Sequence, residues 1–190
     1  MRRAGFVLVG GRSSRMGRDK ALLPWKDAPI VEQVAQTVEQ AAGNVALIGH
    51  PERYRDLNRV CLPDLHPGLG PLSGVETALA SGLGHWNLVV ACDMPELDAG
   101  WLSKLLEIGE TGNLACVAAR DESGIVHPLC AVYRTDCLVA VERAIARNSL
   151  RAHDLLKDLD AALCDIPGLI PNVNTPEEWT RWQQVQQRPS

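Results

Sequence analysis

The fold is decided by one stretch of the sequence, Leu88-Val89-Val90-Ala91-Cys92-Asp93-Met94-Pro95. Its first five residues are apolar and leave no polar face, which is typical of a strand buried on both sides in a parallel sheet. The apolar run stops at a carboxylate and is followed by a proline, so the strand is expected to end there. A buried parallel strand needs helices on both of its faces, and the flanking sequence supplies them.

Apolar runs of strand length alternate with apolar residues at helical spacing along the chain. The further expected strands cover residues 6–9, 45–48, 60–62, 114–118, 129–133 and 162–166. The expected helices carry Ile30, Val34 and Val38; Val75, Leu79 and Leu83; Leu102, Leu105 and Leu106, capped by Asp98; Leu138, Val141 and Ile145; Leu155, Leu156 and Leu159; and a last helix opened by Thr175-Pro176-Glu177-Glu178. This alternation predicts one α/β domain over residues 1–190, with a frayed tail at 183–190 and a mostly parallel sheet covered on both faces.

The composition excludes several classes of protein. Nineteen basic and 23 acidic residues give a formal net charge of −4, whereas a nucleic-acid coat is strongly basic. Apolar residues make up 46% and charged residues 22%, which excludes wholesale disorder. No apolar run approaches the ~20 residues of a membrane helix, and the first one stops at Gly10, too early for a signal peptide. We therefore expect a cytoplasmic protein that binds neither nucleic acid nor membrane.

The cysteines point to a reducing compartment. There are six of them, scattered mostly through apolar runs, and none forms a Cys-x-x-Cys pair. A disulfide framework or a zinc site would need closer spacing. Small buried thiols are the prediction for Cys61, Cys92, Cys116, Cys130, Cys137 and Cys164.

Glycines and cations crowd the loop after the first strand, Leu8-Val9-Gly10-Gly11-Arg12-Ser13-Ser14-Arg15-Met16-Gly17-Arg18-Asp19-Lys20. The glycines permit close approach of the backbone, and backbone N–H groups together with cations describe a phosphate cradle. Five residues separate Gly11 from Gly17, so this is not a Walker A loop, and the dinucleotide-binding pattern of glycines is absent as well.

Two later carboxylates are candidates for the same site, because ligands of such sheets bind beyond the carboxyl ends of the strands. Asp93 is placed either to bind Mg²⁺, which takes only one or two protein carboxylates, or to cap the turn before Pro95. Asp64 opens a loop rich in glycine and proline, which is either a close-approach loop for a ligand or a rigid surface loop.

Two motifs carry a resemblance to a known family. The string LVGGRSSRMGRDKALL resembles the signature loop of the small nucleotidyltransferases, most closely the molybdenum cofactor guanylyltransferases, whose members typically show Leu-Ala-Gly-Gly-x-Ser-x-Arg-Met-Gly-x-Asp-Lys. Val9 stands where that family usually has alanine. The segment ACDMPEL resembles the family's Asp-x-Pro motif, whose aspartate binds Mg²⁺. Weaker similarities extend the resemblance from residue 5 to about 179.

The resemblance implies a three-layer, Rossmann-like nucleotidyltransferase fold that transfers GMP from GTP to molybdopterin, with Mg²⁺ as cofactor. Pyrophosphate and the guanine dinucleotide cofactor would be the products, and proteins of molybdoenzyme maturation would be further partners. The roles that it implies fall into three groups: Leu8, Val9, Gly10, Gly11, Arg15, Lys20, Asp64, Gly70 and Asp93 for the nucleotide; Lys20, Arg15 and Asp93 for catalysis, with Asp93 as the metal ligand; and His127, Asn172 and Asn174 for the substrate.

Other readings stay open at this stage. Relatives often offer an asparagine to the guanine after the second strand, whereas this chain has Gly49-His50-Pro51. A cytidylyltransferase acting on molybdopterin, or a nucleotidyltransferase acting on a sugar or polyol phosphate, therefore remains an alternative. A catalytically silent nucleotide-binding cofactor chaperone is a third, against which Lys20 and Asp93 argue. The arginines 134, 147 and 151 either meet the phosphate of the pterin or are solvated surface residues.

Overall fold

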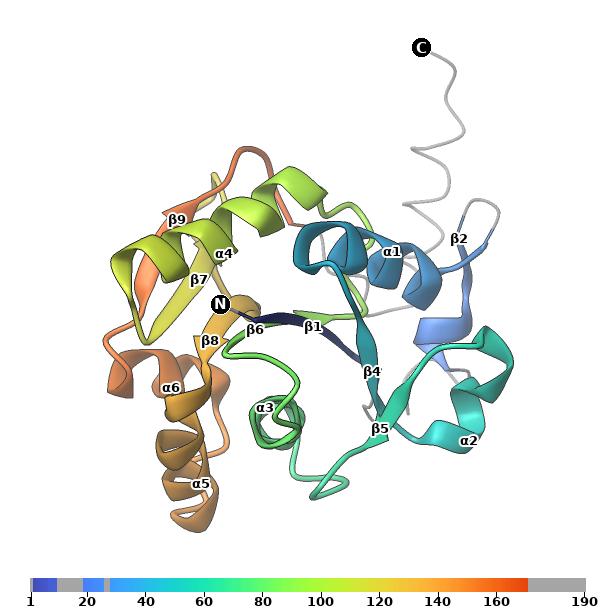
Figure 1. Ribbon diagram of the computed structural model, residues 1–190, viewed down its shortest axis with the longest axis horizontal. Helices are drawn as coiled ribbons and strands as arrows, with labels where there is room; N and C mark the ends of the chain where they lie inside the picture. The colour runs from blue at the N-terminus through green and yellow to red at the C-terminus, as the bar shows by residue number, and fades with distance from the viewer. Residues whose placement is uncertain (1, 10–18, 26–27, 171–190) are drawn as a thin grey trace.

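The computed structural model describes residues 2–9, 19–25 and 28–170. Its centre is a seven-stranded sheet with the strand order β5-β4-β1-β6-β8-β7-β9 (Figure 1). The strands are β1 (Arg3–Leu8), β4 (Ala46–Gly49), β5 (Cys61–Pro63), β6 (Trp86–Ala91), β7 (Cys116–Arg120), β8 (Val126–Arg134) and β9 (Ala162–Asp165). β6 lies in the middle of the sheet, and it confirms the buried strand expected from residues 88–92.

The sheet is mostly parallel, as predicted. β1 pairs in parallel with both β4 and β6, β4 pairs in parallel with β5, and β7 pairs in parallel with β9. β8 is the strand that runs the other way, antiparallel to both β6 and β7. It follows β7 through a tight turn, and antiparallel neighbours can be joined in that way whereas parallel ones need a crossover.

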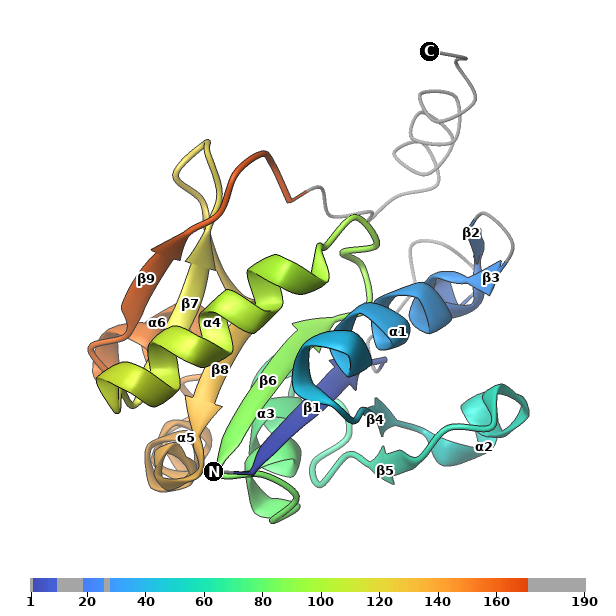
Figure 2. The same ribbon diagram turned by 45° about the horizontal axis from the view of Figure 1, so that its top comes forward.

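Helices cover both faces of this sheet (Figures 1 and 2). On one face lie α1 (Ile30–Ala42) and α4 (Ala99–Gly112), and on the other lie α3 (Pro71–Ala80), α5 (Leu138–Ala146) and α6 (Ala152–Asp158). β6 serves both layers, since Leu88 and Val90 belong to the core under α1 and α4 while Val89 belongs to the core under α3 and α5. The expected three-layer α/β architecture is therefore confirmed.

Several short elements were not expected from the sequence. The short helix α2 (Pro51–Tyr54) and the 3-10 turn η2 (Arg55–Leu57) follow β4, and η3 (Thr135–Cys137) precedes α5. The 3-10 turn η1 (Lys20–Leu22) precedes a two-stranded hairpin of β2 (Pro24–Trp25) and β3 (Ala28–Pro29). These elements are too short to show a hydrophobic period of their own, and two of them place residues of the site described below.

The boundaries differ from the expected ones in instructive ways. The helix expected to carry Leu83 ends at Ala80; Gly82 then adopts a φ of 66°, and Leu83 is 42% exposed outside the helix. That part of the prediction was wrong because a left-handed glycine stops a helix whatever the spacing of the apolar residues. Asp98, in contrast, caps α4 as predicted, its Oδ1 accepting hydrogen bonds from the N–H groups of Gly100 and Trp101.

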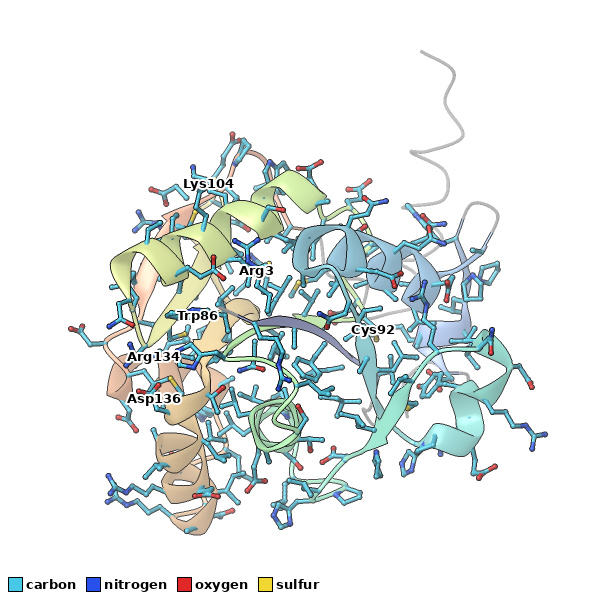
Figure 3. The ribbon with its side chains drawn as sticks, viewed as in Figure 1. Arg3, Trp86, Cys92, Lys104, Arg134 and Asp136 are labelled. Carbon is cyan, nitrogen blue, oxygen red and sulfur yellow. The ribbon has the colours of Figure 1, made fainter. Side chains whose placement is uncertain are left out.

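Charged side chains form ion pairs at the amino edge of the sheet, the side where β1 and β6 begin (Figure 3). Arg3 donates two hydrogen bonds to Glu110 at the end of α4, at 2.9 and 2.6 Å. Arg134, at the end of β8, donates two hydrogen bonds of 2.8 Å to Asp136, and its guanidinium lies 5.9 Å from the ring centre of Trp86. Every charge of this group therefore has a partner within the fold.

The burial predicted for the cysteines is confirmed for all of them but Cys61. All six cysteines are free; five of them are buried and Cys61 is half-buried. Burial raises the pKa of Cys92 and of Cys130 to about 12. In the part of the chain that the structure describes, no helix is both long and apolar enough to cross a membrane.

Candidate active site

β1 and β6 are neighbouring parallel strands, so their carboxyl ends lie side by side (Figure 2). We call the side of the sheet where these strands end its carboxyl edge. Leu8 is the register partner of Ala91, and the N–H of Cys92 donates to the carbonyl of Leu8 at 3.2 Å. The side chains of Leu8 and Val9 are buried, and Val9 belongs to the core cluster under α1. The valine that departs from the family's usual alanine thus packs in the core in this chain.

Lys20 and Asp93 meet at this edge although 73 residues separate them in the sequence. The Nζ atom of Lys20 lies 2.9 Å from Oδ2 of Asp93, and the two side chains are 18% and 17% exposed. Lys20 is placed by η1, which Asp19 caps by accepting a hydrogen bond from the N–H of Ala21 at 3.1 Å. Two of the residues expected to be catalytic therefore form one ion pair directly beyond the strand ends.

The other oxygen of the Asp93 carboxylate is available for a cation. Oδ1 is buried, and it has no hydrogen-bond partner among the residues that the structure describes. Leaving a buried acceptor unsatisfied costs about 1–3 kcal/mol, and more when the group is charged. Within the same described ranges, no three His, Cys, Asp or Glu side chains gather as a metal site. A single carboxylate fits Mg²⁺, which takes most of its ligands from phosphates and water.

Tyr54 links the end of β1 to Asp19, the residue before Lys20, and the sequence analysis did not find it. Its buried hydroxyl lies 2.6 Å from the carbonyl oxygen of Val9 and 2.8 Å from Oδ2 of Asp19. Burial, together with the hydrogen bond and the charge of Asp19, raises the pKa of Tyr54 well above its usual range. The phenol therefore stays a hydrogen-bond donor, and it joins the end of β1 to the turn that carries Lys20.

Asp64 organises the loop before α3. Its Oδ1 accepts hydrogen bonds from the N–H of His66 at 3.1 Å and from the hydroxyl of Ser73 on α3. Gly70, next to α3, has a φ of 88°, which is a conformation that favours glycine. In the described part of the chain, no hydrogen bond or ion pair joins Asp64 to Lys20 or Asp93. The expected contact of Asp64 and Gly70 with a nucleotide stays a prediction.

A cavity of about 630 Å³ opens beside Asp93. Its walls come from the end of β6, the N-terminus of α3, the start of β8, and α6 with the residues that lead into it. His127, expected on the substrate side, lines the same cavity as Asp93. The structure thus gathers a candidate metal ligand and a candidate substrate residue around one space.

His127 is held by a second buried residue that the sequence analysis missed, Asp121. Its Nε2 lies 3.0 Å from Oδ2 of Asp121, and both side chains are buried. Asp121 also accepts hydrogen bonds from the N–H groups of Ser123 and Ile125, at 3.0 Å each. Burial acts to raise the pKa of Asp121, but the hydrogen bonds outweigh it and hold that pKa well below its usual range. His127 therefore has a fixed, ionised neighbour.

Five expected site residues lie outside the described ranges: Gly10, Gly11, Arg15, Asn172 and Asn174. Their roles stay predictions. The remaining ones form three groups. Leu8, Val9, Lys20 and Asp93 meet at the ends of β1 and β6, and His127 lines the same cavity as Asp93. Asp64 and Gly70 belong to the loop before α3.

Solved structures share this arrangement of strands and helices. Molybdopterin-guanine dinucleotide biosynthesis protein A from Archaeoglobus fulgidus superposes with a TM-score of 0.79 at 23% identity, over 96% of this chain and 98% of that one. A Mycobacterium tuberculosis protein solved in complex with manganese superposes with a TM-score of 0.69 at 18% identity, over 97% and 99%. The chain therefore shares the fold of these two proteins over nearly its whole length.

The sequence identifies the class of protein, a nucleotidyltransferase. It belongs to the family of MobA-like NTP transferase domains, whose model matches residues 5–171. A molybdenum cofactor guanylyltransferase from Xanthomonas euvesicatoria is 38% identical over 185 residues, which cover 93% of this chain and 92% of the relative. The resemblance carried by the glycine-rich loop and by the Asp93 motif is therefore confirmed at the level of the family.

Proposed function

We propose that this chain transfers GMP from GTP to the terminal phosphate of molybdopterin, releasing pyrophosphate and forming the guanine dinucleotide cofactor. The observation that carries the proposal is the Lys20–Asp93 pair, which lies at the strand ends and opens onto a cavity that can receive an acceptor. Curated relatives that align over almost the whole chain are named for the same activity, which supports the choice of substrates.

In this proposal the chain contributes charge and position rather than covalent chemistry. Asp93 would hold Mg²⁺ through its carboxylate, and the unpartnered Oδ1 supports that role. Mg²⁺, when bound, neutralises charge on the reacting phosphates. Lys20 leaves Asp93 to neutralise the charge that builds on the α-phosphate, while Arg15 and the backbone of residues 8–11 hold the triphosphate. The manganese complex of the mycobacterial neighbour is consistent with a divalent metal in this fold.

The acceptor needs no general base, because a phosphate monoester is already largely ionised at neutral pH. His127 would position it from the cavity wall, where Asp121 fixes the imidazole ring. Asn172 and Asn174 are proposed on the substrate side, and Asp64 and Gly70 on the nucleotide side. Proteins of molybdoenzyme maturation are proposed as receivers of the product.

Pyrophosphate release tests the proposal. The purified chain is incubated with molybdopterin and Mg²⁺ and with GTP, CTP, ATP or UTP in turn. Release with GTP alone is expected. Release with CTP alone would assign cytidylyl transfer, and release only with a sugar or polyol phosphate as acceptor would change the acceptor. Nucleotide binding without any transfer would favour the silent cofactor chaperone.

Variants of the ion pair test the site separately. Asp93→Ala and Lys20→Ala should each lower kcat by about 10²- to 10³-fold or more, with a melting temperature close to that of the parent. Lys104→Ala removes an exposed lysine from α4 and serves as the matched control, with unchanged kcat. Full activity in both site variants would exclude the proposed mechanism.

A further inference from the structure

One wall of the cavity that Asp93 lines is built by α6, which is firmly attached to the fold. Ala152, Leu155 and Leu156 of α6 are buried in the core on that face of the sheet. Nε2 of His153 lies 3.1 Å from the carbonyl oxygen of Val126 on β8, which joins the helix to a strand that also lines the cavity. A side chain carried by this wall therefore starts from a fixed backbone position.

The structure separates the three arginines that the sequence left as candidates for an acceptor phosphate. Arg134 is engaged by Asp136 and Asn113 at the amino edge of the sheet, far from Asp93. Arg147 follows α5 as its C-cap and does not line the cavity. Arg151 is the one that lines the cavity together with Asp93.

Arg151 is also a cation whose guanidinium has no ion pair or hydrogen bond within the described ranges of the chain. The arginines at positions 3, 59, 120 and 134 each pair with a carboxylate of the fold. Lys157, the other long cation of the cavity wall, lies 3.5 Å from Asp154, which also lines the cavity. The charge of Arg151 is therefore open to an anion that enters the cavity.

We infer that Arg151 binds the phosphate monoester of the acceptor and orients it for attack. The inference rests on the proposed function, since that function requires a phosphate to enter the space beside Lys20 and Asp93. Two planar N–H donors of an arginine match two oxygens of a phosphate, which leaves a third oxygen to attack the α-phosphorus. Arg151 lines this cavity together with Asp93, whereas Leu8, Val9 and Lys20 are not among its lining residues. Arg151 is thus a residue for the acceptor and not for GTP.

Steady-state kinetics with two variants and one control test this assignment. Arg151→Ala should raise KM for molybdopterin about 10- to 100-fold while KM for GTP changes less than twofold. Arg151→Lys keeps the charge but loses the fork, so it should recover part of the affinity. Arg147→Ala removes an arginine from the neighbouring helix end outside the cavity and should leave both KM values unchanged.

Equilibrium titrations make the outcome independent of turnover. Molybdopterin binding to Arg151→Ala should weaken by a similar factor, and GTP binding with Mg²⁺ should stay at the parental value. Equal losses for both ligands, or a loss no larger than that of Arg147→Ala, would overturn the inference while the proposed function stands. A parent protein that neither binds nor modifies molybdopterin would overturn both.

Discussion

The amino and carboxyl edges of the central sheet differ in how completely their charged side chains are paired. At the amino edge, Arg3 and Arg134 are each bound by a carboxylate, and the atoms left without a partner there, in Trp86 and Asn87, belong to neutral groups. At the carboxyl edge, Oδ2 of Asp93 pairs with Lys20, but Oδ1 has no hydrogen-bond partner among the described residues, and a cavity opens beside it. An unsatisfied ion is far more costly than an unsatisfied neutral group. The comparison teaches that the charges of the amino edge are used up in ion pairs of the fold, whereas the carboxyl edge leaves one carboxylate oxygen without a partner in the described part of the chain.

The largest effect is expected from the amino edge. Trp86 is fully buried between β6 and α4, where its ring lies against Gly109. Trp86→Ala should lower the free energy of unfolding by about 3–5 kcal/mol, because it empties a large volume in a packed core. Urea unfolding measures this loss, and Trp86→Phe should lose less. GTP affinity, titrated below the melting transition, should be unchanged. A variant that is folded but no longer binds GTP would show that the amino edge also contributes to ligand binding.

A smaller effect that combines stability and catalysis is expected at Tyr54. Tyr54→Phe removes the hydroxyl that joins Val9 to Asp19, so the free energy of unfolding should fall by about 1 kcal/mol. Because Lys20 follows Asp19 directly, kcat should also fall, by roughly 3- to 10-fold through misplacement of the lysine. Tyr133→Phe is the matched control, since it removes a buried hydroxyl that donates to the carbonyl of Pro128 at 2.7 Å. Equal effects of the two variants on kcat would show that Tyr54 does not position Lys20.

The smallest effect is expected from an ion pair of the amino edge. The hydrogen bonds from Arg3 hold the pKa of Glu110 below its ordinary value. A lowered pKa in the folded state means that the pair stabilises the fold above about pH 4.3, the usual pKa of glutamate, and that this contribution disappears as the pH falls through the lowered value.

Glu110→Gln should therefore lower the free energy of unfolding by no more than about 1 kcal/mol at pH 7. The difference between parent and variant should shrink toward zero as the pH falls below about 4. Urea unfolding between pH 3.5 and 7 measures it, with kcat at pH 7 unchanged. A difference that does not depend on pH would mean that packing, and not charge, accounts for the role of Glu110.

Local chemistry let the sequence predict most of the elements. The apolar run 88–92 predicted a strand buried on both faces, and β6 occupies the middle of the sheet. The cap at Asp98 and the helix over Ile30–Ala42 were likewise readable, because capping and helical spacing depend on residues only a few positions apart. Strand boundaries shifted by up to three residues, as at β8, where His127 pairs with Ala119 beyond a shift of register.

For the site, the sequence by itself determined which residue types stand in the loops after β1 and β6, and through them the family. Only the tertiary structure decided that Lys20 meets Asp93, that Tyr54 holds Asp19, that Asp121 holds His127, and that Arg151 faces the cavity while Arg134 does not. The physical reason is one of range. Periodicity, capping and turn chemistry act between neighbours in the chain, whereas ion pairs and cavities are made where strand order brings distant segments to the same edge of the sheet.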